Sequence, residues 1–188
     1  MHIQIFSELE QEILRIIARS PIPEDYPHAK NVKEWVLRLK PDADLALQIA
    51  ALAHDIERAD PQRKIKRSEY KDYHAFKKAH AINSGRLISE ILNKYPLSEN
   101  AKKKITHLVE QHELGADNDK DLSVLKDADS ISFFEVNLPF YFERNSEEDT
   151  IFRIRWGYKR LSEPAKNIVK KFKYQDEKLN QLLEKCIY

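Results

Sequence analysis

The scarcity of glycine is the feature that most constrains how this chain can fold. Only 3 of its 188 residues are glycine, and 8 are proline. Folds built from sheets use glycine in the tight turns between strands, because those turns need positive φ angles. The composition therefore favours helices joined by loops that carry proline and aspartate. A chain of this length can also bury a substantial core as one domain.

Apolar residues recur along the chain with the 3.6-residue period of an amphipathic helix. The pattern predicts helices at residues 7–18, 26–39, 42–56, 74–92, 98–112 and 122–134, with two or three more toward the C-terminus. Residues 59–73 are polar and irregular, and we expect an exposed loop or lid there. Residues 113–121 are typical of a turn-rich loop. We predict one all-α domain that spans residues 1–188.

The charge balance gives no support for a general nucleic-acid binder or for a protein of acidic membranes. There are 32 basic and 31 acidic side chains, and the formal net charge is +1. The single cysteine, Cys186, cannot form an internal disulfide, which suits a reducing compartment. No apolar stretch approaches the roughly 18–20 residues that span a bilayer. We therefore expect a cytoplasmic protein with no membrane partner.

Basic residues are concentrated toward the C-terminus. Residues 151–188 hold ten Lys or Arg and four Asp or Glu. A solvated helix face explains such a run of charge. The alternative is that some of these residues, such as Arg153, Arg155, Lys159 or Arg160, meet an anionic substrate. The apolar residues of the same segment are a candidate surface for a homodimer.

Several predicted core helices carry a metal-competent side chain in phase with their apolar residues. These side chains are His28, His80, His112 and Asp129, and the pair His54–Asp55 follows the apolar run 49–53. A lone histidine on an apolar face is usually a core residue bonded to a backbone carbonyl. Four such faces together indicate a nitrogen–oxygen cage for a divalent transition metal. A bound ion would offset the desolvation of the carboxylates and hold the imidazoles neutral.

Whether a titratable residue shares a helix face with apolar residues also decides which other residues belong to the predicted site. His107 lies off the apolar face of its helix, and His74 lies among charged residues at a loop edge. Both are excluded from the predicted site. The helix of Asp127 is apolar on both sides, and we assign Asp127 a supporting role, bonded to a ligand or to a water.

The order of His28, His54–Asp55 and Asp129 resembles that of the HD-domain metal-dependent phosphohydrolases. The similarity covers roughly residues 26–134 in five segments, "YPHAKNVKEWV", "LALQIAALAHDIER", "HAINSGRLISEIL", "HLVEQHE" and "VLKDADSIS". It implies the family's helical bundle, with an HD core at about residues 26–136 and a C-terminal helical extension at about 147–188. The extension that marks cyclic-dinucleotide phosphodiesterases is missing, so the substrate stays open.

The resemblance also implies a cofactor and an activity. The primary metal ligands would be His28, His54, Asp55 and Asp129. A second ion would use His80 and His112, with Asp55 as a bridge. The cofactor would be one or two divalent ions of manganese, iron, cobalt, nickel, zinc or magnesium. The implied activity is hydrolysis of a phosphate ester or anhydride, with a small nucleotide as the favoured substrate class.

Such a reaction needs a proton acceptor and cations around the phosphate. Asp55, Asp127 or Glu57 would accept the proton of the attacking water. The candidates for binding the non-reacting oxygens are Arg58, Lys64, Arg67 and Arg86, although each also fits an ordinary surface charge. Two alternatives stay open. One is a degenerate HD domain that binds metal and nucleotide as a sensor without turnover, and the other is a metal-free helical scaffold.

Overall fold

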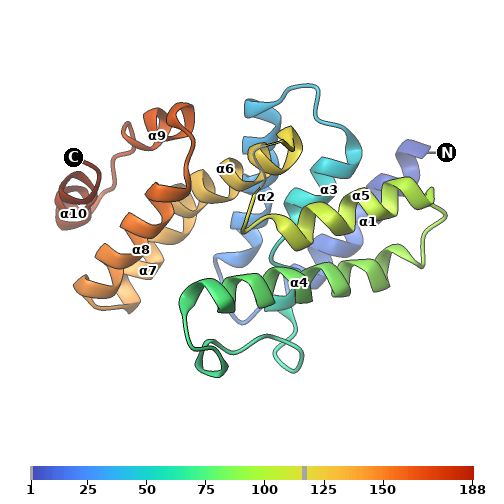
Figure 1. Cartoon of the computed structure of the whole chain (residues 1–188), viewed down its shortest axis with the longest axis horizontal. Helices are drawn as coiled ribbons and strands as arrows, with labels where there is room; N and C mark the ends of the chain where they lie inside the picture. The colour runs from blue at the N-terminus through green and yellow to red at the C-terminus, as the bar shows by residue number, and fades with distance from the viewer. Residues whose placement is uncertain (1, 116–117) are drawn as a thin grey trace.

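The regular structure of the chain is helical throughout residues 2–115 and 118–188, which the computed structural model describes (Figure 1). The first elements are α1 (His2–Ile17), α2 (Asp25–Leu39), α3 (Leu45–Ala53), the 3₁₀ turns η1 (Ile56–Ala59) and η2 (Arg67–Glu69), α4 (Tyr73–Leu92) and α5 (Glu99–Gln111). The later elements are α6 (Lys120–Ser132), the π-helical turn η3 (Phe133–Asn137), α7 (Leu138–Arg144), α8 (Glu147–Arg160), α9 (Glu163–Val169) and α10 (Glu177–Ile187). The predicted all-α fold is confirmed.

Short polar side chains define where many of the helices begin. Seven of them accept a hydrogen bond from a backbone N–H of the first turn, namely Asp44, Asp72, Ser98, Asp119, Ser146, Ser162 and Asp176. These bonds satisfy donors that the helix itself leaves free. The helices predicted at 42–56 and 98–112 are therefore capped at Asp44 and Ser98.

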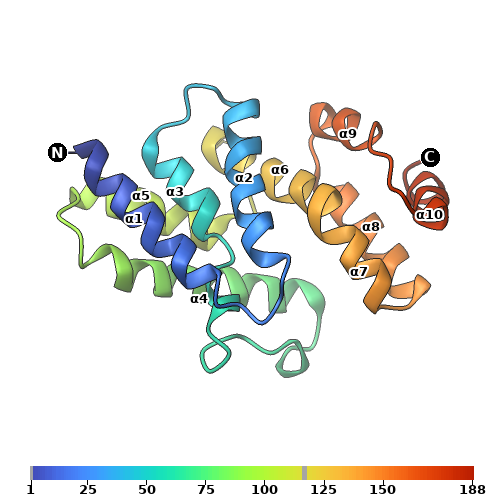
Figure 2. The same cartoon turned by 180° about the vertical axis from the view of Figure 1, so that it is seen from behind.

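Helix α3 is the centre of the bundle. It packs against α1, α2 and α5, and most of its side chains are buried, including the whole run 49–53. Figures 1 and 2 show α6 leading from these helices to a second group, α7 to α10, which extends to the opposite end of the molecule. The buried core is continuous, from Leu9 on α1 to Leu183 on α10.

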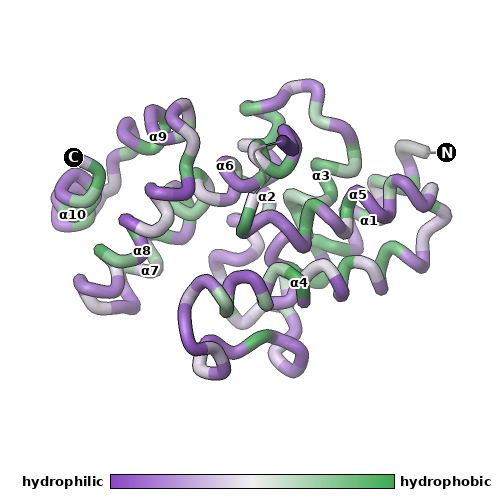
Figure 3. Tube along the Cα trace, in the orientation of Figure 1, coloured by the Kyte–Doolittle hydropathy of each residue, from purple (hydrophilic) through white to green (hydrophobic). Residues whose placement is uncertain are grey.

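Several predicted boundaries differ from the structure, and two of them concern helices that carry the candidate site. The helix predicted to end at residue 134 continues through η3 and α7 to Arg144, and Pro139 fits there because the first turn of α7 can lack its N–H donor. The helix predicted at 42–56 ends at Ala53 and is followed by η1. The loop predicted at 59–73 is mostly hydrophilic (Figure 3) and contains only the turn η2.

The remaining predictions on secondary structure concern the second loop and the membrane. Residues 116–117 of the loop predicted at 113–121 lie outside the described residues. Within the part of the chain that is described, no helix combines the length and the apolarity needed to cross a bilayer.

Candidate metal centre

His54 and Asp55 lie where the buried run of α3 ends. His54 is fully buried, and its Nδ1 donates a hydrogen bond to the carbonyl of Ala51 at 2.8 Å. In the neutral ring this bond places the proton on Nδ1, so that Nε2 keeps a lone pair that a proton or a metal ion can take. Asp55 follows in the turn into η1. The run of small and apolar residues therefore serves to bring an imidazole and a carboxylate into the interior.

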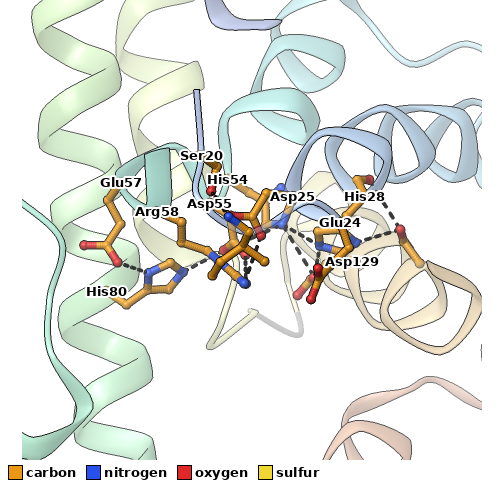
Figure 4. Close-up of polar contacts among 12 residues, drawn as sticks. Ser20, Glu24, Asp25, His28, His54, Asp55, Glu57, Arg58, His80 and Asp129 are labelled. Atoms are coloured by element: carbon orange, nitrogen blue, oxygen red, sulfur yellow. Dashed lines mark hydrogen bonds and ion pairs between the residues drawn. The ribbon is translucent and has the colours of Figure 1, made fainter. Parts of the chain in front are cut away.

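The other three predicted histidines are oriented in the same way. The Nδ1 of His112 donates to a backbone carbonyl one turn earlier at 2.7 Å. The Nδ1 of His80 donates to Glu57 Oε1 at 2.7 Å (Figure 4). The Nδ1 of His28 lies 2.8 Å from Ser132 Oγ. Partners of this kind fix the ring and its tautomer in metal sites. In all four residues Nε2 is the atom left for a ligand.

His28, His54 and Asp129 form a first buried group, which we call the His28 cluster. The two Nε2 atoms lie 3.2 Å apart, and Asp129 Oδ1 lies 3.4 Å from that of His28 and 3.5 Å from that of His54 (Figure 4). Two facing lone pairs repel unless a proton or another cation lies between them. The geometry therefore fits a bound cation.

Asp55, His80, His112 and Glu113 form a second group, which we call the Glu113 cluster. Asp55 Oδ1 lies 2.6 Å from His80 Nε2 and 3.7 Å from His112 Nε2. It also lies 3.7 Å from Nε2 of His54, so that Asp55 joins the two clusters. The Nε2 of His112 is buried without a hydrogen-bond partner. A buried acceptor atom without a hydrogen-bond partner is what we expect of a side chain that binds a metal ion.

The electrostatics of the clusters favour a positive charge. Burial lowers the pKa of His54, but the carboxylates of Asp55 and Asp129 outweigh it and raise that pKa to about 9. Burial raises the pKa of Asp129, yet the contacts with His28 and His54 hold it well below its usual range. Ionised carboxylates at this depth need a cation, which can be a proton or a metal.

Glu113 is the member of the clusters that the sequence analysis missed. It follows α5 directly and is only 7% exposed. One carboxylate oxygen lies 3.4 Å from His112 Nε2, the other lies 2.9 Å from Arg160 Nη1, and Lys77 forms a short ion pair with the first. Its place in a turn-rich segment suggested exposure. The available signal was its position directly after His112 at a helix end, which repeats the His54–Asp55 arrangement.

Glu57 holds His80 in place. Its Oε1 accepts from His80, and its Oε2 accepts from the N–H of Ile65 at 2.8 Å and from Asn83 Nδ2 at 2.6 Å. Burial raises the pKa of Glu57, but the contacts with His80, Ile65 and Asn83 together outweigh it and lower that pKa. The proton transfer predicted for Glu57 is therefore replaced by a role in positioning the imidazole.

Asp127 does not belong to the site, contrary to the prediction. It lies about 200° from Asp129 around α6, since neighbouring helix positions diverge by about 100°. Its Oδ1 accepts from the N–H of Ser162 at 2.9 Å, and its Oδ2 accepts a short bond from the hydroxyl of the same residue. The carboxylate therefore ties α6 to the start of α9.

We expect Asp127→Ala to destabilise the fold and to leave the metal content unchanged. Two hydrogen bonds to a nearly buried carboxylate are lost, so that the free energy of unfolding should fall by about 1–3 kcal/mol. Urea unfolding and metal analysis of the same preparation measure the two quantities. Ser162→Ala is the matched variant on the other side of the contact. A loss of metal at unchanged stability would return Asp127 to the site.

A cleft of about 350 Å³ opens beside the clusters and reaches Glu57 and His80. A smaller recess next to it is lined by His28, Asp55 and Asp129. Five basic residues line the cleft, Arg58, Lys64, Lys77, Arg144 and Arg153, together with the aromatic residues Tyr73, Phe76, Phe133 and Tyr141. The mouth of the site is thus both cationic and aromatic.

The structure separates the four cations predicted to bind substrate. Arg58 and Lys64 line the cleft, and Arg58 bridges Asp25 at 2.9 Å and Asp55 at 3.0 Å. Arg67 and Arg86 are exposed and line neither the cleft nor the recess. Arg67 is bound to a carbonyl of its own loop, and Arg86 donates a hydrogen bond to Asn83 Oδ1 at 3.0 Å. The structure therefore places these two residues outside both cavities, and their role in binding substrate stays a prediction.

The fold and the clusters define an all-α protein with buried groups of histidine and carboxylate side chains that can hold a metal ion. The donor set of nitrogen and oxygen atoms suits a divalent ion. The chain belongs to the family described as "Domain of unknown function (DUF4202)", whose family model matches residues 10–183. No curated protein and no solved structure matches the chain.

Proposed function

We propose that this protein is a metal-dependent phosphohydrolase of the HD-domain type, which cleaves a phosphate ester or anhydride of a small molecule, with a nucleotide as the favoured substrate. One observation carries the proposal. Four buried imidazoles direct Nε2 toward the carboxylates of Asp55 and Asp129, directly beside a cleft lined by basic residues. Cationic groups next to a divalent metal are what phosphoryl transfer requires.

The residues of the two clusters would hold the metal. His28, His54, Asp55 and Asp129 would hold one ion, and His80 and His112 would hold a second one, with Asp55 shared. Such ions supply a lowered pKa for a coordinated water and polarise a phosphoryl oxygen. Manganese, iron, cobalt, nickel, zinc and magnesium all accept ligands of this kind.

The other side chains would position the metal-binding imidazoles and neutralise the charge of the phosphate. Glu57 and Ser132 fix the rings of His80 and His28. Arg58 and Lys64 line the cleft, where they can neutralise phosphate oxygens. Of the three carboxylates considered for proton transfer, Asp55 is the one that faces both clusters, and we assign it that role.

Release of phosphate or pyrophosphate from a nucleotide panel tests the proposal. With manganese, cobalt or magnesium present, we expect turnover that a chelator stops and that added metal restores. Metal analysis of protein purified without chelator completes the test. Bound metal without any release of phosphate would favour the sensor. Protein that neither contains nor takes up metal would leave only the helical scaffold.

A further inference from the structure

Arg153 of α8 occupies a distinctive place at the mouth of the site. It lines both the cleft and the recess. Its guanidinium lies over the rings of Phe133 at 4.8 Å, Tyr73 at 5.2 Å, Trp156 at 5.3 Å and Tyr141 at 5.6 Å. It also donates a short hydrogen bond to the hydroxyl of Tyr73. The four rings therefore form a cage around the cation.

Arg153 has no carboxylate partner among the described residues, whereas most of the neighbouring cations have one. Lys64 also lacks one there, but it lines only the cleft and not the recess. Arg58 is paired with Asp25 and Asp55, Arg144 with Glu24, and Lys77 and Arg160 with Glu113. The contrast shows that the paired cations are already neutralised locally. Arg153 lies where the two cavities meet, and its guanidinium charge is still available to bind an anion.

The aromatic cage only partly offsets the burial of this charge. Cation–π contacts are weak compared with the cost of moving an unpaired charge out of water. Burial lowers the pKa of Arg153 to about 9, and the nearby Arg160 and Arg58 add to the effect. An anion that enters the cleft would remove this penalty.

We propose that Arg153 binds a non-reacting phosphate group of the substrate and thereby determines which phosphorylated molecules the cleft accepts. The inference rests on the proposed phosphohydrolase function for the identity of the anion. The planar fork of a guanidinium matches two phosphate oxygens. The cage and the hydroxyl of Tyr73 would hold this fork toward the cavities. The subsite would then be contributed by the C-terminal extension, outside the predicted HD core.

Calorimetric titration with inorganic phosphate tests the proposal without any turnover. Manganese-loaded protein and chelator-treated protein are both titrated at constant ionic strength. Arg153→Met should weaken phosphate binding by about tenfold or more in each form, because a charge-assisted bidentate contact is lost. Arg153→Lys keeps the charge without the fork and should weaken binding less. Arg155→Met is the matched control, since Arg155 is an exposed residue of the same helix.

Two results would overturn the subsite. One is equal phosphate affinity in the wild type and in folded Arg153→Met, and the other is wild-type protein that binds no phosphate in either form. If Arg153→Met does not fold, Arg153→Lys decides in its place, and its binding must be weaker than that of the wild type. Phosphate binding that depends on Arg153 without hydrolysis of any nucleotide would reject the enzyme and retain the subsite. Hydrolysis that is unaffected by replacement of Arg153 would reject the subsite and retain the enzyme.

Discussion

Replacing His54 or Asp55 by alanine is expected to abolish metal-dependent hydrolysis. His54 contributes one of the two facing Nε2 atoms of the His28 cluster. Asp55 Oδ1 lies within 3.7 Å of three imidazoles and joins both clusters. Loss of either ligand removes transition-state stabilisation of several kcal/mol, which corresponds to a fall in kcat/KM on the order of 10³-fold or more. Initial rates at saturating manganese measure the effect.

The control for this prediction separates loss of the site from loss of the fold. Circular dichroism should show helix content close to that of the wild type, because η1 and α3 keep their backbone contacts. His107→Ala removes an exposed histidine that contacts neither cluster, and it should retain full activity. Near-normal turnover in Asp55→Ala would rule out the proposed active site.

The double replacement of His80 and His112 by alanine is expected to lower the bound metal from two ions per chain to one. The Glu113 cluster then retains only two carboxylates, while the His28 cluster keeps all of its ligands. Affinity at a nitrogen–oxygen site depends strongly on the number of ligands that it offers. Equilibrium dialysis against manganese, followed by elemental analysis, gives the number of ions per chain.

The matched control removes two histidines elsewhere. His74→Ala combined with His107→Ala deletes the same number of imidazoles from exposed positions, and it should still bind two ions. An unchanged number of ions after the loss of His80 and His112 would mean that the second group holds no metal. A single ion in the wild type would lead to the same conclusion and would leave a mononuclear site.

The fold and the burial of the histidine and carboxylate groups could be predicted because both depend on which residues share a helix face. A residue that shares a face with core side chains points to the interior, so that His28, His80, His112 and Asp129 were placed correctly as buried groups. The run before His54 is apolar on all sides because α3 packs against α1, α2, α5 and α6. The helical period and the expected burial therefore predict most of where these histidine and carboxylate side chains lie.

The surrounding residues depend on contacts that no local pattern reports. Asp127 binds Ser162, which is 35 positions away, and Glu113 is buried because Lys77 and Arg160 come from other helices. The helical period also indicates which basic residues of the C-terminal segment face the site. Arg153 and Arg160 are seven positions apart and both line the recess, whereas Arg155 and Lys159 are exposed.

Arg160 contacts Glu113 at 2.9 Å and Asp129 at 3.5 Å, so that a single guanidinium from α8 serves both clusters. A fragment trimmed to residues 26–136 would retain every histidine of the two clusters and yet lose this shared counterion. Its excess negative charge would attract divalent ions more strongly and with less discrimination. Metal affinities measured on such a minimal domain would therefore misrepresent those of the intact chain, and any substrate preference would be distorted with them.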